Sequence, residues 1–258
     1  MIPKQAEEAF KEHAIECFPC EAVGCVVDGA YVPLKNEADH PEVEFLVSTY
    51  PQEATCILHT HTQARNADPQ EADMRGQQAH AKPWGVAWVE GKRVSPITWF
   101  GDQVPIAPYL GRRFINGQQD CWCLVRDMYR GSLGVEGLPN IPRNDDWFKG
   151  PKDIARNLLS VENIEAAGFE RISLADIQPW DLLLGSIGSH ITNHCSLYAG
   201  NQQVLHHVQN RLSCRALVTP WLPKVNHCLR YKGFAGRMLP TPSEVLNENS
   251  AVARRVGG

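Results

Sequence analysis

The chain has 258 residues, of which 43% are hydrophobic and 21% are charged, and its net charge is −4. This composition suits one large or two small folded domains, and it lacks the basic excess that nucleic-acid-binding proteins carry. We see no apolar run long enough to span a bilayer and no secretory signal at the start. The nine cysteines have no framework spacing, which favours reduced thiols in a cytoplasmic setting.

The first part of the chain alternates helix and strand patterns. Apolar residues at helical spacing predict an amphipathic helix over residues 6–17. The dipeptide Asp28-Gly29 predicts a hairpin between two short strands. The other elements expected here are a strand at 42–49, a strand at 54–61, a helix after Asp73 and a second hairpin over 84–100.

The residue pattern changes at "GDQVPIAPYLGRR", residues 101–113. This segment is rich in Pro and Gly and has no helical or strand period, so we expect a linker. The elements expected after it are a helix beginning near Cys121, a helix over 153–168, and strands at 181–187, 194–200 and 202–208. The polar residues 241–258 are expected to remain outside the folded core.

The segment "CILHTHTQARNADPQEAD", residues 56–73, carries a first group of chemically active side chains. His59 and His61 lie two apart on an expected strand, so they point to the same face and can bind one metal ion. Asp73 can supply a third ligand, and two His with one carboxylate leave a coordination position open, as a catalytic zinc site requires. The alternative is a chance pair of histidines at a solvated strand end.

The residues around this segment resemble the JAB/MPN family with its JAMM metallopeptidase motif. The stretch "PCEAVG", a hairpin, "LHTH" and "PQEAD" follow one another in the order of that family, over roughly residues 5–100. The resemblance implies that Glu21 is the general acid and base, and that His59, His61 and Asp73 hold Zn²⁺.

Two features depart from the JAMM pattern. The interval from His61 to Asp73 is one residue longer than usual. The serine of the family is missing, and Pro69 and Gln70 are the only residues at its place. These departures favour metal binding over turnover in the first domain.

A second group centres on a cysteine at an expected helix start. The helix macrodipole lowers the pKa of a thiol there, so Cys121 is a candidate nucleophile. His194 and His206 lie on two strands that turn at Gly200-Asn201, and such a hairpin can bring a base and an orienting imidazole together. The alternative is that Cys121 is a small buried core residue.

The phrases "DCWCLV", "QPWDLLL" and "HCSLYAG" resemble the NlpC/P60 family of papain-like peptidases. The resemblance implies that Cys121 is the nucleophile, His194 the base and His206 the group that orients the base. It also implies that Tyr109 lines the site.

Several residues depart from that family's pattern. Trp122 and Cys123 stand where Ser-Gly is common, and Trp180 replaces a glycine, so we expect a reshaped pocket wall. Cys123 and Cys195 are expected to point away from the site in structural roles. His207 is expected on the face of its strand opposite to His206.

These observations predict an α+β chain of two small domains. Residues 1–100 are expected to form a JAB/MPN-like mixed sheet with helices, and residues 101–113 a linker. Residues 114–240 are expected to form a papain-like NlpC/P60 domain of helix and antiparallel sheet, and residues 241–258 a polar tail.

The two modules in this order resemble the tail tip assembly proteins of lambda-like siphophages. The resemblance implies a component of the virion tail tip, present in the host cytoplasm during assembly, with other tail tip proteins as partners. It also implies peptidoglycan stem peptides as the substrate, and we expect no nucleic-acid partner. The alternatives are a structural or assembly factor with silent sites, and a cellular cysteine peptidase.

Overall fold

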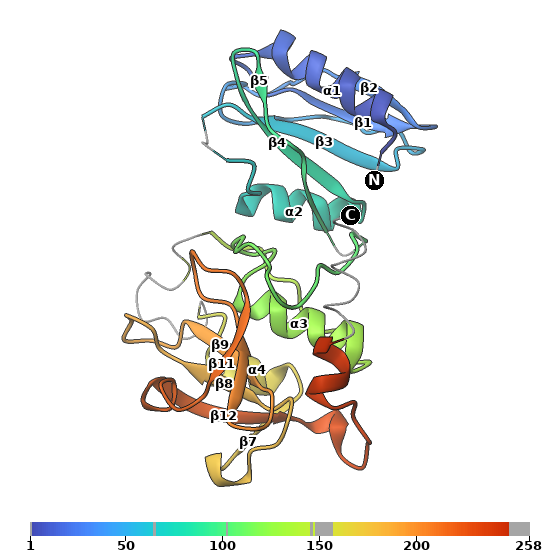
Figure 1. Ribbon diagram of the computed structural model, residues 1–258. Coiled ribbons are helices and arrows are strands. Elements are labelled where there is room, and N and C mark those ends of the chain that lie inside the picture. The colour runs from blue at the N-terminus through green and yellow to red at the C-terminus, as the bar shows by residue number, and fades with distance from the viewer. Residues whose placement is uncertain (1, 64–65, 102, 145–146, 148–156, 248–258) are drawn as a thin grey trace. The chain divides into compact units, whose positions relative to one another are not determined.

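The structure is a computed structural model. It describes residues 2–63, 66–101, 103–144, 147 and 157–247. The chain divides into two compact units, Met1–Pro105 and Ile106–Gly258, and each contains helices and one six-stranded sheet (Figure 1). The expected α+β class is therefore confirmed. Within the described ranges, none of the helices combines the length and the apolar character that crossing a bilayer would need.

The first unit is a mixed sheet between two helices. Its elements are α1 (Lys4–Cys17), β1 (Val23–Val27), β2 (Ala30–Leu34), β3 (Cys56–His61), α2 (Glu71–His80), β4 (Trp84–Glu90), β5 (Arg93–Val94) and β6 (Thr98–Phe100). The strand order is β2-β1-β3-β4-β5, and β6 also pairs with β4. Only β3 and β4 run parallel, because α2 connects them as a crossover. Figure 1 shows α1 and α2 on opposite faces of this sheet.

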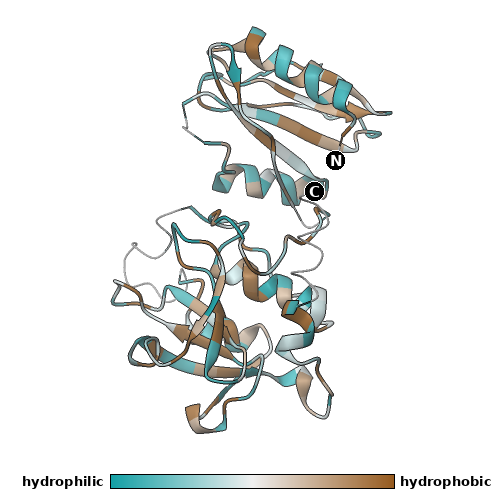
Figure 2. Cartoon of the chain, in the orientation of Figure 1, coloured by the Kyte–Doolittle hydropathy of each residue, from teal (hydrophilic) through white to brown (hydrophobic). Residues whose placement is uncertain are grey.

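Side chains on β3 alternate between the two helical layers. Leu58 packs with Phe10 of α1, whereas Ile57 packs with Trp84 on the other face. Figure 2 shows the mixed polar and apolar surface of α1 above this largely apolar strand. His59 lies two residues after Ile57 and therefore faces α2, as does the second histidine of the strand.

The strand expected at 42–49 does not form. This segment is a turn followed by irregular chain, and the side chain of Asn36 satisfies part of its backbone. Asn36 Oδ1 accepts from the N–H of Leu46 at 3.1 Å, and its Nδ2 donates to the carbonyl of Glu44 at 3.0 Å. These bonds replace a sheet ladder. The helix expected after Asp73 begins two residues earlier, at Glu71.

The second unit packs one long helix on an antiparallel sheet. Its elements are α3 (Cys121–Ser132), α4 (Val161–Ala166), β7 (Phe169–Ile172), η2 (Leu174–Asp176), β8 (Leu182–Gly185), β9 (His194–Tyr198), β10 (Gln203–His206), β11 (Cys214–Leu217), η3 (Leu222–Lys224), β12 (Val225–Tyr231) and η4 (Lys232–Phe234). The strand order is β11-β10-β9-β8-β12-β7. The main core lies between α3 and one face of this sheet, where Leu124 and Tyr129 meet Leu197 and Leu229. The helix expected over 153–168 is described as α4 only, and residues 153–156 lie outside the described residues.

Residues 106–113, within the expected linker, are part of the second unit. Tyr109 is buried in its core, and Arg112 Nη1 donates to Asp127 Oδ2 on α3 at 2.8 Å. The backbone N–H of Arg112 donates to Ser213 Oγ at 2.9 Å, which ties the segment to the sheet as well.

The expectation that residues 241–258 stay outside the core is wrong for their described part. Val245 and Leu246 are both buried in the core of the second unit. These two adjacent apolar residues interrupt an otherwise polar stretch, and their burial anchors it. Residues 248–258 lie outside the described residues.

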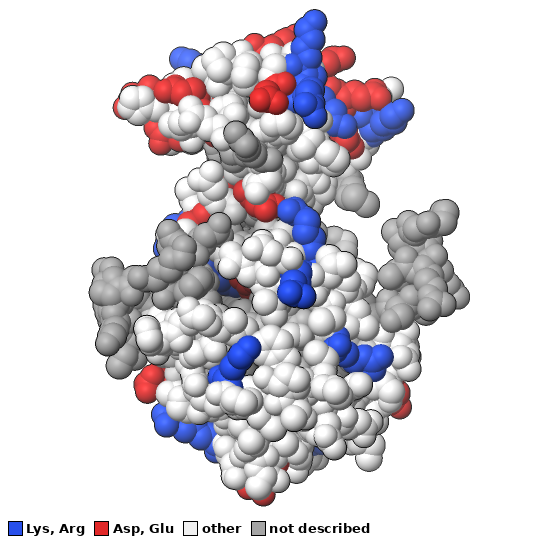
Figure 3. Space-filling view, turned by 60° about the vertical axis from the view of Figure 1, so that its left-hand side comes forward, with Lys and Arg blue, Asp and Glu red and all other residues white. Residues whose placement is uncertain are grey.

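The density of charged side chains on the visible surface differs between the two units. Figure 3 shows Lys, Arg, Asp and Glu interspersed on the first unit, while the face of the second unit in view carries only scattered charges. No single-sign patch stands out on the faces in view among the described residues.

Candidate active site and candidate metal centre

Asp120 sets the start of α3 and so positions Cys121. Its Oδ1 accepts from the backbone N–H of Cys123 at 3.0 Å, which makes Asp120 the N-cap of the helix. Its other oxygen accepts from Gly117 N at 2.7 Å and from the guanidinium of Arg143, whose Nε lies at 2.9 Å. Cys121 is therefore the first helical residue, at the positive end of the helix dipole.

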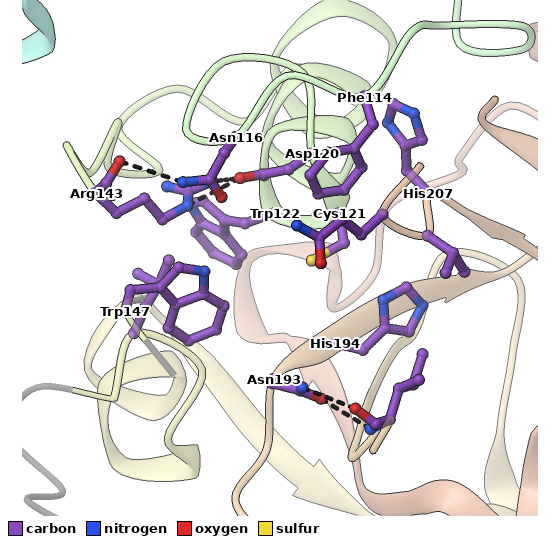
Figure 4. A pocket seen from close by; sticks show the side chains of 14 residues that line it. Phe114, Asn116, Asp120, Cys121, Trp122, Arg143, Trp147, Asn193, His194 and His207 are labelled. Atoms are coloured by element: carbon purple, nitrogen blue, oxygen red, sulfur yellow. Dashed lines mark hydrogen bonds and ion pairs between the residues drawn. The ribbon is translucent and has the colours of Figure 1, made fainter. Parts of the chain in front are cut away.

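Cys121 and His194 line one pocket, as their side chains in Figure 4 show. A hydrogen bond from Cys195 lowers the pKa of the Cys121 thiol, and the hydrogen bond and charge of His194 lower it further. Burial and the charge of Asp120 oppose this shift without cancelling it. The thiolate is therefore favoured at neutral pH, as a nucleophilic cysteine requires.

Cys195 does not line the pocket, but its thiol acts on Cys121 from the core side. Cys195 follows His194 on β9, so the two side chains face opposite sides, and that of Cys195 enters the core beneath α3. Burial first, and then the bond to Cys121, raise the pKa of Cys195 well above its ordinary value. It therefore stays protonated beside the Cys121 sulfur. Cys123, by contrast, is an inert core thiol whose pKa burial raises to about 12.

His206 lies behind His194, on the neighbouring strand β10. The ring centroids of His194 and His206 are 5.7 Å apart, with the planes at 81°. Neither Nε2 of His194 nor Nδ1 of His206 has a hydrogen-bond partner among the described residues. Burial, followed by the charges of His194 and His207, lowers the pKa of His206 to about 4, so this ring is neutral at pH 7.

Trp221 contacts both imidazoles and was missed from the sequence. Its ring stacks on His194 at 5.7 Å and 28°, and meets His206 edge-on at 4.5 Å and 73°. Trp221 lies between β11 and β12, in a stretch with no period or motif, so no sequence signal could have found it.

Tyr109 is not where the family resemblance implies. Its hydroxyl lies 2.9 Å from Ser132 Oγ, at the end of α3 opposite to Cys121. Phe114 lines the pocket instead, in ring contact with His207 at 5.1 Å.

The two tryptophans expected to reshape the pocket wall have different roles. Trp122 lines the pocket and donates from Nε1 to the carbonyl of Pro139 at 2.9 Å. Trp180 does not line it. Trp180 is buried in the core with φ of 76°, the left-handed region that favours glycine, and its Nε1 donates to Pro240 O at 2.7 Å.

Three candidate metal-binding side chains converge in the first unit. His59 Nε2 lies 3.3 Å from His61 Nε2 and 3.2 Å from Asp73 Oδ1, and His61 Nε2 lies 3.1 Å from Asp73 Oδ2. In a tetrahedral zinc site with bonds of about 2.0–2.1 Å, the ligand atoms are roughly 3.3 Å apart. The donor set and its spacing therefore fit a zinc ion. Among the described residues, this is the one cluster of this kind.

Backbone geometry explains the convergence. The two histidines share one face of β3, and Asp73 occupies the first turn of α2, which covers that face. Gln70, at the place of the family's serine, is the N-cap of α2, and its N–H donates to Asp73 Oδ2 at 2.6 Å. Burial raises the pKa of Asp73, but the charges of His59 and His61 and their hydrogen bonds outweigh it, so the carboxylate stays ionised.

Glu21 lies across the sheet from His61. β1 pairs with β3 so that Val23 is opposite His59, and the bond from Thr60 N to Ala22 O (2.9 Å) continues this register toward the start of β1. Glu21 lines a groove together with His61 and Asp73. Burial raises the pKa of Glu21 to about 7, so near neutral pH this carboxyl can both accept and return a proton.

Comparisons with known proteins gave matches to one family model, to curated relatives and to solved structures. The NlpC/P60 family model matches residues 106–230. Tail tip assembly protein K of Escherichia phage lambda is 32% identical over 180 residues, which cover 64% of this chain and 87% of that protein. Tail tip assembly protein K of Escherichia phage N15 is 26% identical over 244 residues, which cover 89% of this chain and 95% of that protein. A solved NLP/P60 protein of Staphylococcus aureus, similar to a lipoprotein, matches with 15% identity and a TM-score of 0.34, over 48% of this chain and 37% of that chain.

Proposed function

The chain belongs to the family of tail tip assembly protein K and contains an NlpC/P60 domain, and from this premise we propose that its second unit is a cysteine endopeptidase acting on peptidoglycan stem peptides. The observation that carries this proposal is that Cys121 and His194 line one pocket at the start of α3, where neighbouring groups lower the pKa of the thiol. An inert core cysteine such as Cys123 has its pKa raised instead.

The proposed reaction begins at Cys121 and His194. His194 takes the proton of Cys121, and the sulfur attacks the carbonyl carbon of the scissile peptide bond. The backbone N–H of Cys121, the first residue of α3, has no carbonyl partner within the helix and is available to the developing oxyanion, whereas the N–H of Cys123 is bound by Asp120. His194 returns the proton to the leaving amine as the C–N bond breaks. Water, deprotonated by His194, then hydrolyses the thioester and restores Cys121.

His206 orients His194 in this scheme rather than transferring the proton. Its ring is neutral at pH 7 and lies behind His194, away from Cys121. Family membership supports a place at the virion tail tip, with host cytoplasm as the site of assembly and other tail tip proteins as neighbours.

The decisive experiment is digestion of defined muropeptides with the purified full chain, with the products identified by mass. We expect cleavage of a stem peptide bond that is abolished by Cys121→Ala. His194→Ala should lower the rate more than His206→Ala, because it removes the proton carrier. Cys123→Ala is the matched control, and it should retain activity. No cleavage by the wild-type chain, or cleavage that survives Cys121→Ala, would favour the alternative of an assembly factor with silent sites.

For the first unit we propose a zinc centre of the JAMM type held by His59, His61 and Asp73. The distances of 3.1–3.3 Å between their ligand atoms support this proposal. A zinc ion there would lower the pKa of a bound water and polarise a substrate carbonyl. Glu21, with a pKa of about 7, would carry protons in the same groove.

A further inference from the structure

The two active-site histidines of the second unit share one aromatic neighbour. We propose that Trp221 is a positioning residue of the cysteine site, whose indole holds His194 facing Cys121 and keeps His206 behind it. This inference rests on the proposed peptidase function, and it assigns the orientation of the imidazoles to ring packing.

The three rings contact one another pairwise. The indole of Trp221 is 5.7 Å from the ring of His194 and 4.5 Å from that of His206, and the two imidazoles are 5.7 Å apart. The indole is nearly parallel to His194, at 28°, and nearly perpendicular to His206, at 73°. Stacking on one ring and edge contact with the other restrict the rotation of both imidazoles.

Hydrogen bonds contribute little to the orientation of the two imidazoles. Nε2 of His194 and Nδ1 of His206 are buried, and each is without a partner among the described residues. The other nitrogen of His206 meets only the weak sulfur partner Cys214, at 3.5 Å. A base is commonly oriented by a hydrogen bond from a third group. Here the ring contact of His206 with His194 is supplemented by the indole, which packs on both imidazoles.

The turn that carries Trp221 is fixed to the strand that faces His194. Gly185 on β8 pairs with His194 on β9. On its other side the carbonyl of Lys224 approaches so closely that a Cβ on Gly185 would lie 2.6 Å from that oxygen. The N–H of Ser186 donates to the same carbonyl at 3.0 Å. Because Gly185 has no Cβ, the turn that carries Trp221 can pack against β8 at the residue that pairs with His194.

Trp221 is itself restrained in its turn. The backbone N–H of Trp221 donates to Val218 O at 2.8 Å, and Lys224 N donates to Trp221 O at 2.8 Å, which closes the turn. Lys224 Nζ also lies over the indole at 5.0 Å, a cation–π contact. A rigid indole in a rigid turn can therefore impose an orientation on its neighbours.

The test compares Trp221→Leu, which keeps an apolar side chain without a ring, with Trp221→Phe, which keeps a ring. Leu222→Ala is the matched control, since Leu222 belongs to the same turn and to the apolar cluster on the same face. Two readouts are taken on the full chain. One is kcat and KM for muropeptide cleavage. The other is the pH dependence of Cys121 alkylation by iodoacetamide, followed by peptide mass mapping.

We expect Trp221→Leu to lower kcat by about 10–100-fold with little change in KM, since a misplaced base loses productive geometry. Trp221→Leu should also slow Cys121 alkylation near neutral pH and move its rise to higher pH, because the thiolate loses its aligned partner. Trp221→Phe and Leu222→Ala should both keep most of the rate and the wild-type alkylation profile.

Two results would overturn the inference. One is a wild-type alkylation profile in Trp221→Leu. The other is an equal loss in the Leu and Phe variants that matches a lowered thermal midpoint, which would indicate a merely structural role. If the wild-type chain cleaves no muropeptide but the alkylation profiles still differ as expected, the role of Trp221 stands and the proposed substrate falls.

Discussion

The thiol of Cys195, on the core side of β9, neighbours the sulfur of Cys121 and lowers its pKa by hydrogen bonding. A thiolate at Cys121 thus has a donor beneath it in addition to His194. The donor is fully buried and has its pKa raised well above the ordinary value, so it holds its proton over the working range of pH.

Removing this donor should raise the pKa of Cys121. Because the pKa of Cys121 is lowered, its thiolate is present at a pH below the ordinary titration range of a thiol. Loss of the Cys195 donor should therefore move the alkylation of Cys121 to higher pH. A hydrogen bond to a charged group is worth about 1.5–3 kcal/mol, so Cys195→Ala should move the midpoint of alkylation up by about 1–2 pH units. Iodoacetamide rates at Cys121 between pH 5 and 10 measure this.

Cys195→Ser should restore part of the effect, because a hydroxyl can still donate. The matched control is Cys228→Ala, which removes a buried thiol on the opposite face of the same sheet. An unchanged midpoint in Cys195→Ala would show that His194 alone sets the pKa of Cys121.

The family resemblance and the structure disagree on Tyr109, and a single variant separates them. The hydroxyl of Tyr109 contacts Ser132 and does not reach the pocket. Tyr109→Phe should therefore leave peptidase kcat and KM unchanged, while it costs about 1 kcal/mol of unfolding free energy through the lost hydrogen bond. Urea denaturation and muropeptide kinetics on the same preparation check both parts. A large fall in kcat at unchanged stability would restore Tyr109 to the site.

The buried ion pair of Asp120 and Arg143 should dominate the stability of the helix start. Their side chains are each only 3% exposed. Asp120→Ala leaves the guanidinium without its counter-charge and removes the N-cap, so we expect a loss of about 3–5 kcal/mol in urea denaturation. Arg171→Ala, which breaks an exposed pair with Glu165, is the control and should have little effect. Equal losses in the two variants would contradict this ranking of the two ion pairs.

The sequence predicted elements whose signal is local. The dipeptide Asp28-Gly29 turns between β1 and β2, and the Cys121 helix begins at its Asp120 cap, because a turn or a cap depends only on neighbouring residues. The prediction of a strand at 42–49 was wrong for the opposite reason. The segment alternates like a strand, but the side chain of Asn36 binds its backbone, and periodicity does not reveal such a tertiary contact.

The same distinction applies to the candidate sites. His59 and His61 could be placed on one face from their spacing alone, since a strand alternates with period two. Trp221 and Cys195 could not be found. The first reaches the histidines through the packing of a turn on β8, and the second through the packing of α3 on β9. The strands β7, β11 and β12 were missed for a similar reason, because their pattern depends on which face the sheet buries.

The ligand set of the first unit predicts stoichiometric metal binding. We expect the full chain, stripped with a chelator, to bind about one Zn²⁺ per chain, with a raised thermal midpoint of the first unit. His61→Ala and Asp73→Ala should each abolish tight binding, because each removes one of three protein ligands. Metal analysis by mass spectrometry, and Co²⁺ absorption as a spectroscopic substitute, measure this without reference to activity.

His80→Ala is the matched control, since His80 lines the same groove but is not in the ligand cluster. Zinc binding that persists in His61→Ala, or is lost in His80→Ala, would place the ion elsewhere. The absence of any binding by the wild-type chain would rule out the proposed centre.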